Sequence, residues 1–278
     1  AAMTEIMSGQ CTDAQIAGWL IGLNMKGESA DEIAASIKVM REACLNIPCS
    51  DPNAIDIVGT GGDGLGTYNI STAAVFVAAG AGVTVAKHGN RALSSKSGSA
   101  DVLSSLGINT SCSVQTMTDC LEELKVSFMF APLLHPAMKH AIGPRRELGV
   151  RTIFNLLGPM TNPAGVRRGV LGVFDAHYCR LLAEAGRQLG VDHMLFVHGR
   201  DGLDELTLTD KTYVIEVKGN DVKEYELDAT SLGLKPCKMT ELIGGTPEEN
   251  ADAVRAIFSG EKNAYRDAVI LNAAAGIY

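Results

Sequence analysis

The chain has 278 residues, of which 46% are hydrophobic and 5% aromatic, and this size allows one large domain or two unequal ones. Its 32 acidic and 24 basic side chains give a net charge of −8, which argues against a protein that binds nucleic acid through an extended basic surface. No apolar run is long enough to cross a bilayer, no signal peptide is visible, and seven scattered cysteines favour the reducing cytoplasm over a disulfide framework.

Residues 12–46 predict two helices with a turn near Lys26-Gly27, because apolar side chains recur at helical spacing on one face of each segment. Residues 48–53 follow as a linker. Each helix has polar residues at its start that are suited to cap it, namely Thr12 or Asp13 and Ser29 or Asp31.

From Ile55 onward the pattern changes to short apolar strands that alternate with loops and helices. The strands are expected at 55–58, 83–86, 127–130, 169–174 and 193–197, and the helices between them at 99–106, 116–124 and 177–189. This alternation predicts an α/β fold with a mostly parallel sheet covered by helices on both faces. An antiparallel pair is expected near the C-terminal end of this region, at 211–217 and 221–227.

A glycine-rich loop follows the first strand and precedes a helix expected at 72–79. Five of its first eight residues, 59–66, are glycine, so several backbone N–H groups can turn towards a ligand. The helix start, with Ser71 or Thr72 as N-cap, offers further N–H groups and a positive dipole end. The segment predicts a phosphate or pyrophosphate site, although taken alone it also fits a structural turn before a buried helix.

A second loop rich in hydrogen-bond donors follows the next strand, at 87–101. No Asp or Glu occurs between Gly64 and Ala100, a stretch that contains Lys87, His88, Arg91 and Lys96. Clearing carboxylates from one segment of an acidic protein indicates an anionic ligand there. Because ligands of open α/β sheets bind at the carboxyl ends of the strands, both loops are expected to face one crevice.

Taken together, these motifs and those further along the chain resemble the anthranilate phosphoribosyltransferase family. The similar blocks are GTGGD at 59–63, NIST at 69–72, the KHGNR-type loop at 87–95, RRELG at 145–149, RTIFNLLGP at 151–159 and GLDE at 202–205. They occur in this order and span the chain essentially from end to end. Members of the family usually extend further at both ends.

The resemblance implies a division into two domains. A small helical domain would comprise residues 1–50 and a middle helical segment at about 132–150, and a large α/β domain would comprise 54–131 and 151–278. This architecture is similar to that of nucleoside phosphorylases. The active site would lie between the domains, with hinge-like linkers, and the helical domain would form a homodimer.

The activity implied is transfer of phosphoribose from phosphoribosyl pyrophosphate (PRPP) to the amine of anthranilate, with release of pyrophosphate. The glycine loop would wrap the pyrophosphate and ribose, and Lys87 would face the departing phosphates. The resemblance assigns PRPP binding to Gly59, Gly62, Asp63, Thr67, Asn69, Ile70, Ser71, Thr72, Lys87, His88, Gly89, Asn90, Arg91, Ser94, Ser95 and Ser99.

Magnesium is implied as well, because Mg²⁺ prefers phosphate oxygens, water and one or two carboxylates. Asp204 and Glu205 would bind it, Ser71 would contact a second ion, and two ions are expected. From spacing alone, adjacent acids in a glycine-containing turn are usually just solvated, and a serine at a helix start needs no metal to explain it.

For the acceptor, the resemblance assigns the carboxylate of anthranilate to Arg145, whose planar guanidinium suits bidentate binding. The remaining acceptor contacts would come from Gly59, His88, Asn90, Pro132, His135 and Gly158. From the residues alone, Arg145 and Arg146 fit a solvated helix face, and both histidines fit hydrogen-bonded packing. No nucleophile or general base is expected, because an aromatic amine needs little deprotonation before attack.

Two other functions compete with the transferase. One is a pyrimidine nucleoside phosphorylase of the same architecture, in which inorganic phosphate is the nucleophile. The other is a non-catalytic relative that binds nucleic acid. The KHGNR block, the region of Arg145 and the Asp204-Glu205 pair favour the transferase over the phosphorylase, and the net charge disfavours nucleic-acid binding.

Overall fold

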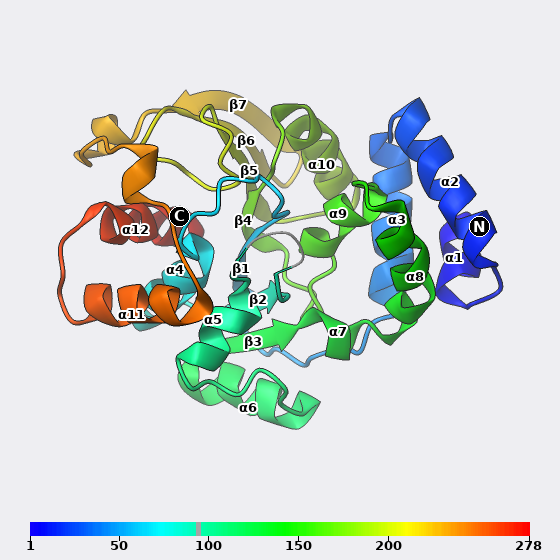
Figure 1. Cartoon of the computed structure of the whole chain (residues 1–278), viewed down its shortest axis with the longest axis horizontal. Coiled ribbons are helices and arrows are strands. Elements are labelled where there is room, and N and C mark those ends of the chain that lie inside the picture. Colours follow the sequence, from blue (N-terminus) through cyan, green and yellow to red (C-terminus); the bar gives the residue numbers. More distant parts are fainter. Residues whose placement is uncertain (93–95) are drawn as a thin grey trace.

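The computed structural model describes residues 1–92 and 96–278, which form a seven-stranded sheet with helices on both faces (Figure 1). The strand order is β3-β2-β1-β4-β5-β6-β7. The first five strands run parallel and the last two are antiparallel. Their bounds are β1 Ile55–Gly59, β2 Val85–Gly89, β3 Val126–Phe130, β4 Arg168–Gly172, β5 His193–Gly199, β6 Thr212–Lys218 and β7 Asp221–Leu227.

The apolar strands supply a core on each side of the sheet. Val58, Leu171 and Phe196 point into one core, whereas their neighbours Ile57 and Val170 point into the other. Burial on both faces explains why these strands are almost continuously apolar. The predicted α/β fold with a mostly parallel sheet is confirmed.

Different helices cover the two faces. On one face α10 (Ala176–Gln188) packs against β5 and β6 and against α3 (Ala30–Glu42). On the other face α4 (Ile70–Gly80) and α12 (Ala264–Ile277) pack against each other and against β1. The remaining helices of the α/β part are α5 Ser99–Ser105, α6 Val114–Leu124, α7 Ala131–Leu134 and α11 Pro247–Phe258.

A helical bundle lies beside this sheet, on the right in Figure 1. The N-terminal helices α1 (Ala2–Met7) and α2 (Asp13–Lys26) pack against α8 (Lys139–Leu148), which comes from the middle of the chain. The short helix α9 (Ile153–Leu157) contacts α2 and α3. Thr12 and Ser29 cap α2 and α3 with complete capping boxes, as expected from the sequence. Among the described residues, no helix has the length and apolar content needed to cross a membrane.

Some elements differ from the prediction. The second strand begins at Val85 and continues to Gly89, so Lys87 and His88 lie in the strand rather than in the loop. The reason is that Val85–Gly89 pairs with the whole of β3. The sequence pattern did not predict helices α9, α11 and α12; in α12 the apolar residues occur on several sides, which hides the helical period.

Candidate active site

The topology of the sheet places three loops at one edge. Strands β1 and β4 are neighbours in the sheet, although β2 and β3 lie between them in the sequence. From β1, strands β2 and β3 extend the sheet in one direction, and β4 begins its extension in the opposite direction. The order of strands therefore reverses between β1 and β4, and such a reversal opens a crevice at the carboxyl ends of the strands. The loops after β1, β4 and β5 meet there.

The glycine loop after β1 adopts backbone conformations that require glycine. Gly61, Gly62, Gly64 and Gly66 have φ angles of 65°, 78°, 78° and 66°, a region that side chains disfavour. At Gly59 the constraint is space, since an added Cβ would lie 2.5 Å from Oδ2 of Asp204. The loop is thus shaped by glycines at several positions and lies directly against the acidic pair.

The acidic pair Asp204-Glu205 is buried, with each residue 9% exposed. Oδ2 of Asp204 accepts a hydrogen bond from the N–H of Gly61 (2.6 Å), and Oε1 of Glu205 accepts one from the N–H of Ser71 (3.1 Å). The interpretation as an ordinary solvated turn is therefore wrong. The two carboxylates connect the loop after β5 to the glycine loop and to the start of α4.

Burial changes the ionisation of this pair. It raises the pKa of Glu205 to about 7, against the lowering effect of Lys87 and of the hydrogen bonds from Ser71. Burial also raises the pKa of Asp204 well above its usual value, and the charges of Asp63 and Glu205 raise it further. A cation placed beside these groups would favour their ionised forms.

The donor set fits magnesium. Hard oxygen atoms come from Asp204, Glu205 and the hydroxyl of Ser71, and Mg²⁺ takes oxygen ligands. Within the part of the chain that the structure describes, no three His, Cys, Asp or Glu side chains converge as a metal site. The protein would therefore supply only part of the coordination shell, and phosphate or water oxygens would complete it.

The start of α4 differs from the prediction. The helix begins at Ile70 with Asn69 as N-cap, so neither Ser71 nor Thr72 is the N-cap. The amide of Asn69 does not cap the helix, because it bonds to Ser97 and Asn250. Instead, the carboxylate of Glu205 accepts a hydrogen bond from a backbone N–H in the first turn of α4. A negative charge at this position interacts favourably with the helix dipole.

The other predicted phosphate contacts near α4 are held within the protein. Thr72 is buried and its hydroxyl donates to Oγ of Ser99 (2.9 Å), joining the starts of α4 and α5. The side chain of Ile70 lies in the core, so only its backbone can face a ligand. Thr67 pairs with Ile243 in a short β-bridge, which fixes the far end of the glycine loop.

Lys87 lies inside the sheet and is 2% exposed. Its Nζ donates to the carbonyl of Ile57 (2.6 Å). Burial lowers the pKa of Lys87, while the charges of Asp56, Glu205 and Asp204 oppose that effect. The ammonium is therefore a buried charge beside the acidic pair, not the end of a solvated loop.

The loop after β2 is held by Asp101 in α5. Oδ2 of Asp101 accepts from the N–H groups of Ala92 and Gly98 (2.9 Å each), and its Oδ1 lies 3.7 Å from Arg91. Gly89 has no room for a side chain, since an added Cβ would lie 2.6 Å from the ring of Phe128. Asn90 is exposed and available to a ligand, whereas Ser94 and Ser95 lie outside the described residues.

His88 and His135 form a buried pair, with 3.2 Å between their Nε2 atoms. Nδ1 of His88 lies 3.1 Å from the carbonyl of Gly158. Burial is the main cause that lowers the pKa of His88 to about 3 and that of His135 to about 4, so both rings are neutral at pH 7. A His88 that donates from Nδ1 to Gly158 accepts at Nε2 from His135. The packing interpretation of this pair holds in the structure, and a role in the acceptor slot remains compatible with it.

The two adjacent arginines of α8 differ in environment. Arg145 is half-buried, its guanidinium lies 5.1 Å from the ring centroid of Phe154, and burial lowers its pKa. Arg146 is exposed, so the interpretation as a solvated helix face fits Arg146 and not Arg145.

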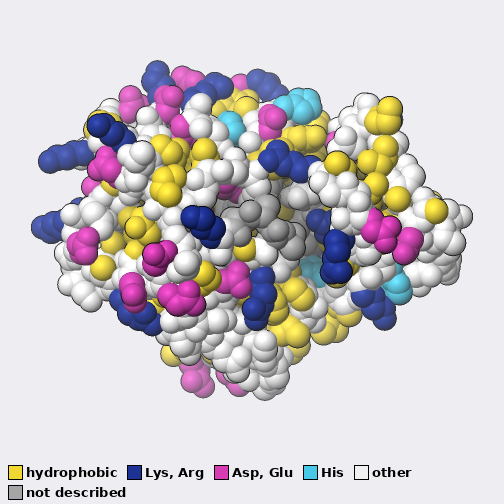
Figure 2. All heavy atoms as spheres, in the orientation of Figure 1, with side chains coloured by type: hydrophobic (Ala, Val, Ile, Leu, Met, Phe, Trp, Pro, Cys, Tyr) yellow, Lys and Arg dark blue, Asp and Glu magenta, His cyan; other side chains and the backbone are white. Residues whose placement is uncertain are grey.

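Pro132, at the start of α7, is exposed. On the face drawn in Figure 2, several Lys and Arg side chains border the middle of the molecule despite its net charge of −8.

Arg151 is a further residue at this site. Its guanidinium donates to the carbonyl of Gly62 and lies 4.2 Å from the ring centroid of Phe174, after β4. Its own carbonyl accepts from the side chain of Asn24 in α2 (3.0 Å). Arg151 thus links the helical bundle to the glycine loop. Its place in the RTIFNLLGP block was the only sequence signal.

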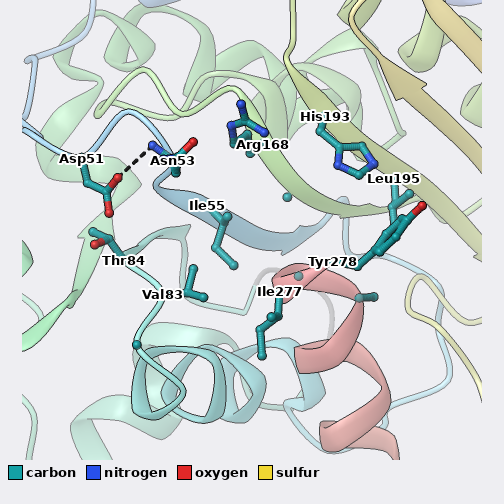
Figure 3. Close-up of a pocket in the computed structure, with 14 residues that line it drawn as sticks. Asp51, Asn53, Ile55, Val83, Thr84, Arg168, His193, Leu195, Ile277 and Tyr278 are labelled. Carbon is teal, nitrogen blue, oxygen red and sulfur yellow. Dashed lines mark hydrogen bonds between the residues drawn. The ribbon is translucent and has the colours of Figure 1, made fainter.

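A cavity of about 280 Å³ lies at the opposite edge of the sheet (Figure 3). Its lining includes Ile55, Arg168 and His193, which are the first residues of β1, β4 and β5, together with Tyr278. The glycine loop and the acidic pair lie at the other ends of these strands. This cavity is therefore separate from the candidate site.

Two family models match the chain. The model described as "Glycosyl transferase family, helical bundle domain" matches residues 1–44, and the one described as "Glycosyl transferase family, a/b domain" matches residues 51–278.

Individual relatives agree. An anthranilate phosphoribosyltransferase of Alkaliphilus metalliredigens is 50% identical over 278 residues, which are 100% of this chain and 82% of that protein. The crystal structure of the enzyme from Thermus thermophilus superposes with a TM-score of 0.95 at 46% identity, over 100% of this chain and 83% of that one. The enzyme from Saccharomyces cerevisiae in complex with PRPP and Mg gives a TM-score of 0.88 at 28% identity, over 98% and 80%. The yeast enzyme is also known in complex with 4-fluoroanthranilate.

Proposed function

We infer that this chain, which belongs to the anthranilate phosphoribosyltransferase family, transfers the phosphoribosyl group of PRPP to the amine of anthranilate and releases pyrophosphate. One observation in the structure supports this most strongly. The GTGGD, NIST and GLDE motifs lie far apart in the sequence, and the hydrogen bonds of Asp204 and Glu205 to Gly61 and Ser71 join them.

On the donor side, we propose that PRPP binds along the glycine loop and the start of α4. Backbone N–H groups of Gly61 and Gly62, both at positive φ, would contact its phosphates. Lys87 would stabilise the charge that develops on the leaving pyrophosphate, because a buried ammonium acts more strongly than a solvated one. The remaining PRPP residues assigned from the family stay predictions.

Magnesium would be held by Asp204 and Glu205, with the hydroxyl of Ser71 as a further ligand. Bound there, it would neutralise charge on the pyrophosphate as the bond to the ribose breaks. The burial of both carboxylates and the family structure with PRPP and Mg support this assignment. Two ions per site remain our proposal.

On the acceptor side, we propose that Arg145 binds the carboxylate of anthranilate. The residue is half-buried and makes no ion pair within the described residues, so its guanidinium is available to a carboxylate ligand. Pro132, His88, His135, Asn90, Gly59 and Gly158 would surround the aromatic ring. The amine then attacks C1 of the ribose, and positioning rather than a general base sets the rate.

We propose that residues 1–50 and about 132–150 form one domain and that 54–131 and 151–278 form the other. The packing of α8 against α1 and α2 supports this division. Arg151, which contacts both parts, lies at the proposed hinge. A homodimer through the helical domain and a cytoplasmic location are further proposals from the family and from the cysteine content.

Product analysis tests the function and its main rival together. The chain is incubated with Mg²⁺ and either PRPP plus anthranilate or thymidine plus inorganic phosphate. We expect N-(5-phosphoribosyl)anthranilate and pyrophosphate from the first mixture and no thymine from the second. Release of thymine without transfer to anthranilate would instead identify a pyrimidine nucleoside phosphorylase.

A further inference from the structure

Strands β1 and β2 are neighbours in the sheet, but they pair at one position only, Ile55 with Val85. The flanking parallel pairs, β1 with β4 and β2 with β3, each pair over five residues. β1 and β2 therefore separate as they approach the carboxyl edge. This is the edge at which the glycine loop and the acidic pair lie.

Side chains take the place of the missing backbone hydrogen bonds in this gap. The carbonyl of Ala86 accepts from Nδ2 of Asn162 (2.8 Å), and the N–H of His88 donates to Oδ2 of Asp56 (3.2 Å). On the facing strand, the carbonyl of Ile57 accepts from Nζ of Lys87 (2.6 Å). The backbone groups are thus satisfied while the two strands stay apart.

Asp56 and Asn162 form the buried bridge across the gap. They are 3% and 5% exposed, and Nδ2 of Asn162 donates to Oδ2 of Asp56 (2.8 Å). Oδ1 of Asp56 has no hydrogen-bond partner within the described residues. A buried carboxylate with an unpaired oxygen is costly, so its presence calls for a reason beyond filling space.

Lys87 supplies that reason. Burial raises the pKa of Asp56 to about 6, and the charge of Lys87 is the largest opposing effect. Conversely, burial lowers the pKa of Lys87, and the charge of Asp56 opposes this lowering more strongly than the charges of Glu205 and Asp204 do. The carboxylate and the ammonium therefore stabilise each other's charged forms inside the sheet.

We propose that Asp56 and Asn162 are positioning residues for the transfer reaction. They hold β1 and β2 apart at the carboxyl edge, and Asp56, hydrogen-bonded to His88 and Asn162, places a buried negative charge beside the part of β2 from which Lys87 would act on the leaving pyrophosphate. This role rests on the proposed function, in which Lys87 faces the pyrophosphate of PRPP.

Asp56→Asn removes the negative charge of this side chain and keeps its size. The amide oxygen can still accept from His88 and Asn162, so the bridge keeps its geometry and loses only its charge. We expect the apparent KM for PRPP to rise about tenfold, the size of one charge-assisted contact. The KM for anthranilate should stay within about twofold, and direct titration with PRPP and Mg²⁺ should show the same loss without any acceptor.

Asn162→Ala tests the other half of the bridge and covers the case in which Asp56→Asn folds poorly. It should weaken PRPP binding in the same direction. Thr84→Val is the matched control, since Thr84 is equally buried but lies just before β2, where it lines the cavity at the opposite edge of the sheet. That variant should bind both substrates like the parent.

These variants distinguish failure of the positioning role from failure of the proposed function. If the parent transfers phosphoribose and both bridge variants bind PRPP like the parent, the positioning role is wrong. Equal losses for PRPP and anthranilate, with a lowered melting temperature, would mean that the bridge is merely structural and would also overturn it. A parent that makes no phosphoribosyl anthranilate would contradict the proposed function itself.

Discussion

The carboxylate of Glu205 accepts a hydrogen bond from the backbone N–H of Ser71 at 3.1 Å. This contact joins the turn after β5 to the first turn of α4 and, with the bond from Gly61 to Asp204, places the acidic pair against the loop that would hold PRPP. Changes to the two carboxylates should therefore affect metal and PRPP binding together.

Asp204→Asn combined with Glu205→Gln should keep the fold and lose most activity, about 100-fold or more. The amides retain hydrogen-bond acceptors for Gly61 and Ser71 but no longer attract a cation. The concentration of Mg²⁺ needed for half-maximal activity should rise. Asp221→Asn, on the exposed edge strand β7, is the control. A normal magnesium titration in the double variant would return the pair to a structural role.

Stability in the absence of metal should fall as the pH rises from about 4.5 to about 7. Folding raises the pKa of Glu205 from 4.5 to about 7, so the folded protein holds the proton of this carboxyl more tightly than the unfolded chain does. The resulting stabilisation is present below pH 4.5 and is lost between about pH 4.5 and 7. Glu205→Gln removes this effect, and at about pH 8 it should melt a few degrees above the parent. Melting curves from about pH 5 to 8 measure it; a constant difference between the two proteins would show that burial does not perturb Glu205.

Lys87→Ala should raise the apparent KM for PRPP by about ten- to 100-fold and change that for anthranilate little. The reason is that the ammonium is buried within the sheet, where the charges of Asp56, Glu205 and Asp204 act on it. Lys87→Met, which keeps the length of the side chain, distinguishes charge from packing. Lys223→Ala, an exposed lysine of the edge strand β7, serves as control. Unchanged kinetics towards PRPP would remove Lys87 from the donor site.

Arg145→Ala should raise the KM for anthranilate and leave that for PRPP nearly unchanged. Arg145→Lys should restore only part of the affinity, because an ammonium lacks the bidentate geometry of guanidinium. Aniline, which has no carboxylate, should be a poor acceptor for the parent and lose little further in the variant. Arg146→Ala is the control, since that neighbour is exposed. If both acceptors suffered equally, Arg145 would be structural and Arg151 the next candidate.

The sequence predicted the sheet well because burial on both faces requires continuous apolar strands. It placed Lys87 and His88 in a loop because charged and polar residues seldom lie inside a parallel sheet. In the structure Lys87 donates to the carbonyl of Ile57 on the neighbouring strand and His88 packs against His135, and no local pattern records such tertiary contacts. Helix α12 was missed for a similar reason, since it is apolar on several sides.

The site motifs were found from their donors and glycines, but their mutual contacts were not. Asn69 is predicted to contact PRPP, and its amide also bonds to Ser97 and Asn250, contacts that the sequence did not predict. Arg151 had no distinctive spacing, and its contacts with Gly62 and Asn24 exist only because the helical bundle packs beside the sheet. Long-range partners of this kind lie beyond sequence periodicity.

The most direct test of the central claim is the fluorescence of anthranilate, followed in the presence of this chain. We expect the signal to disappear only when PRPP and Mg²⁺ are both present, with one pyrophosphate released for each anthranilate consumed. Omission of either one, or the Asp204→Asn, Glu205→Gln double variant, should leave the signal nearly constant. A parent chain that leaves the fluorescence unchanged in the complete mixture would contradict the account.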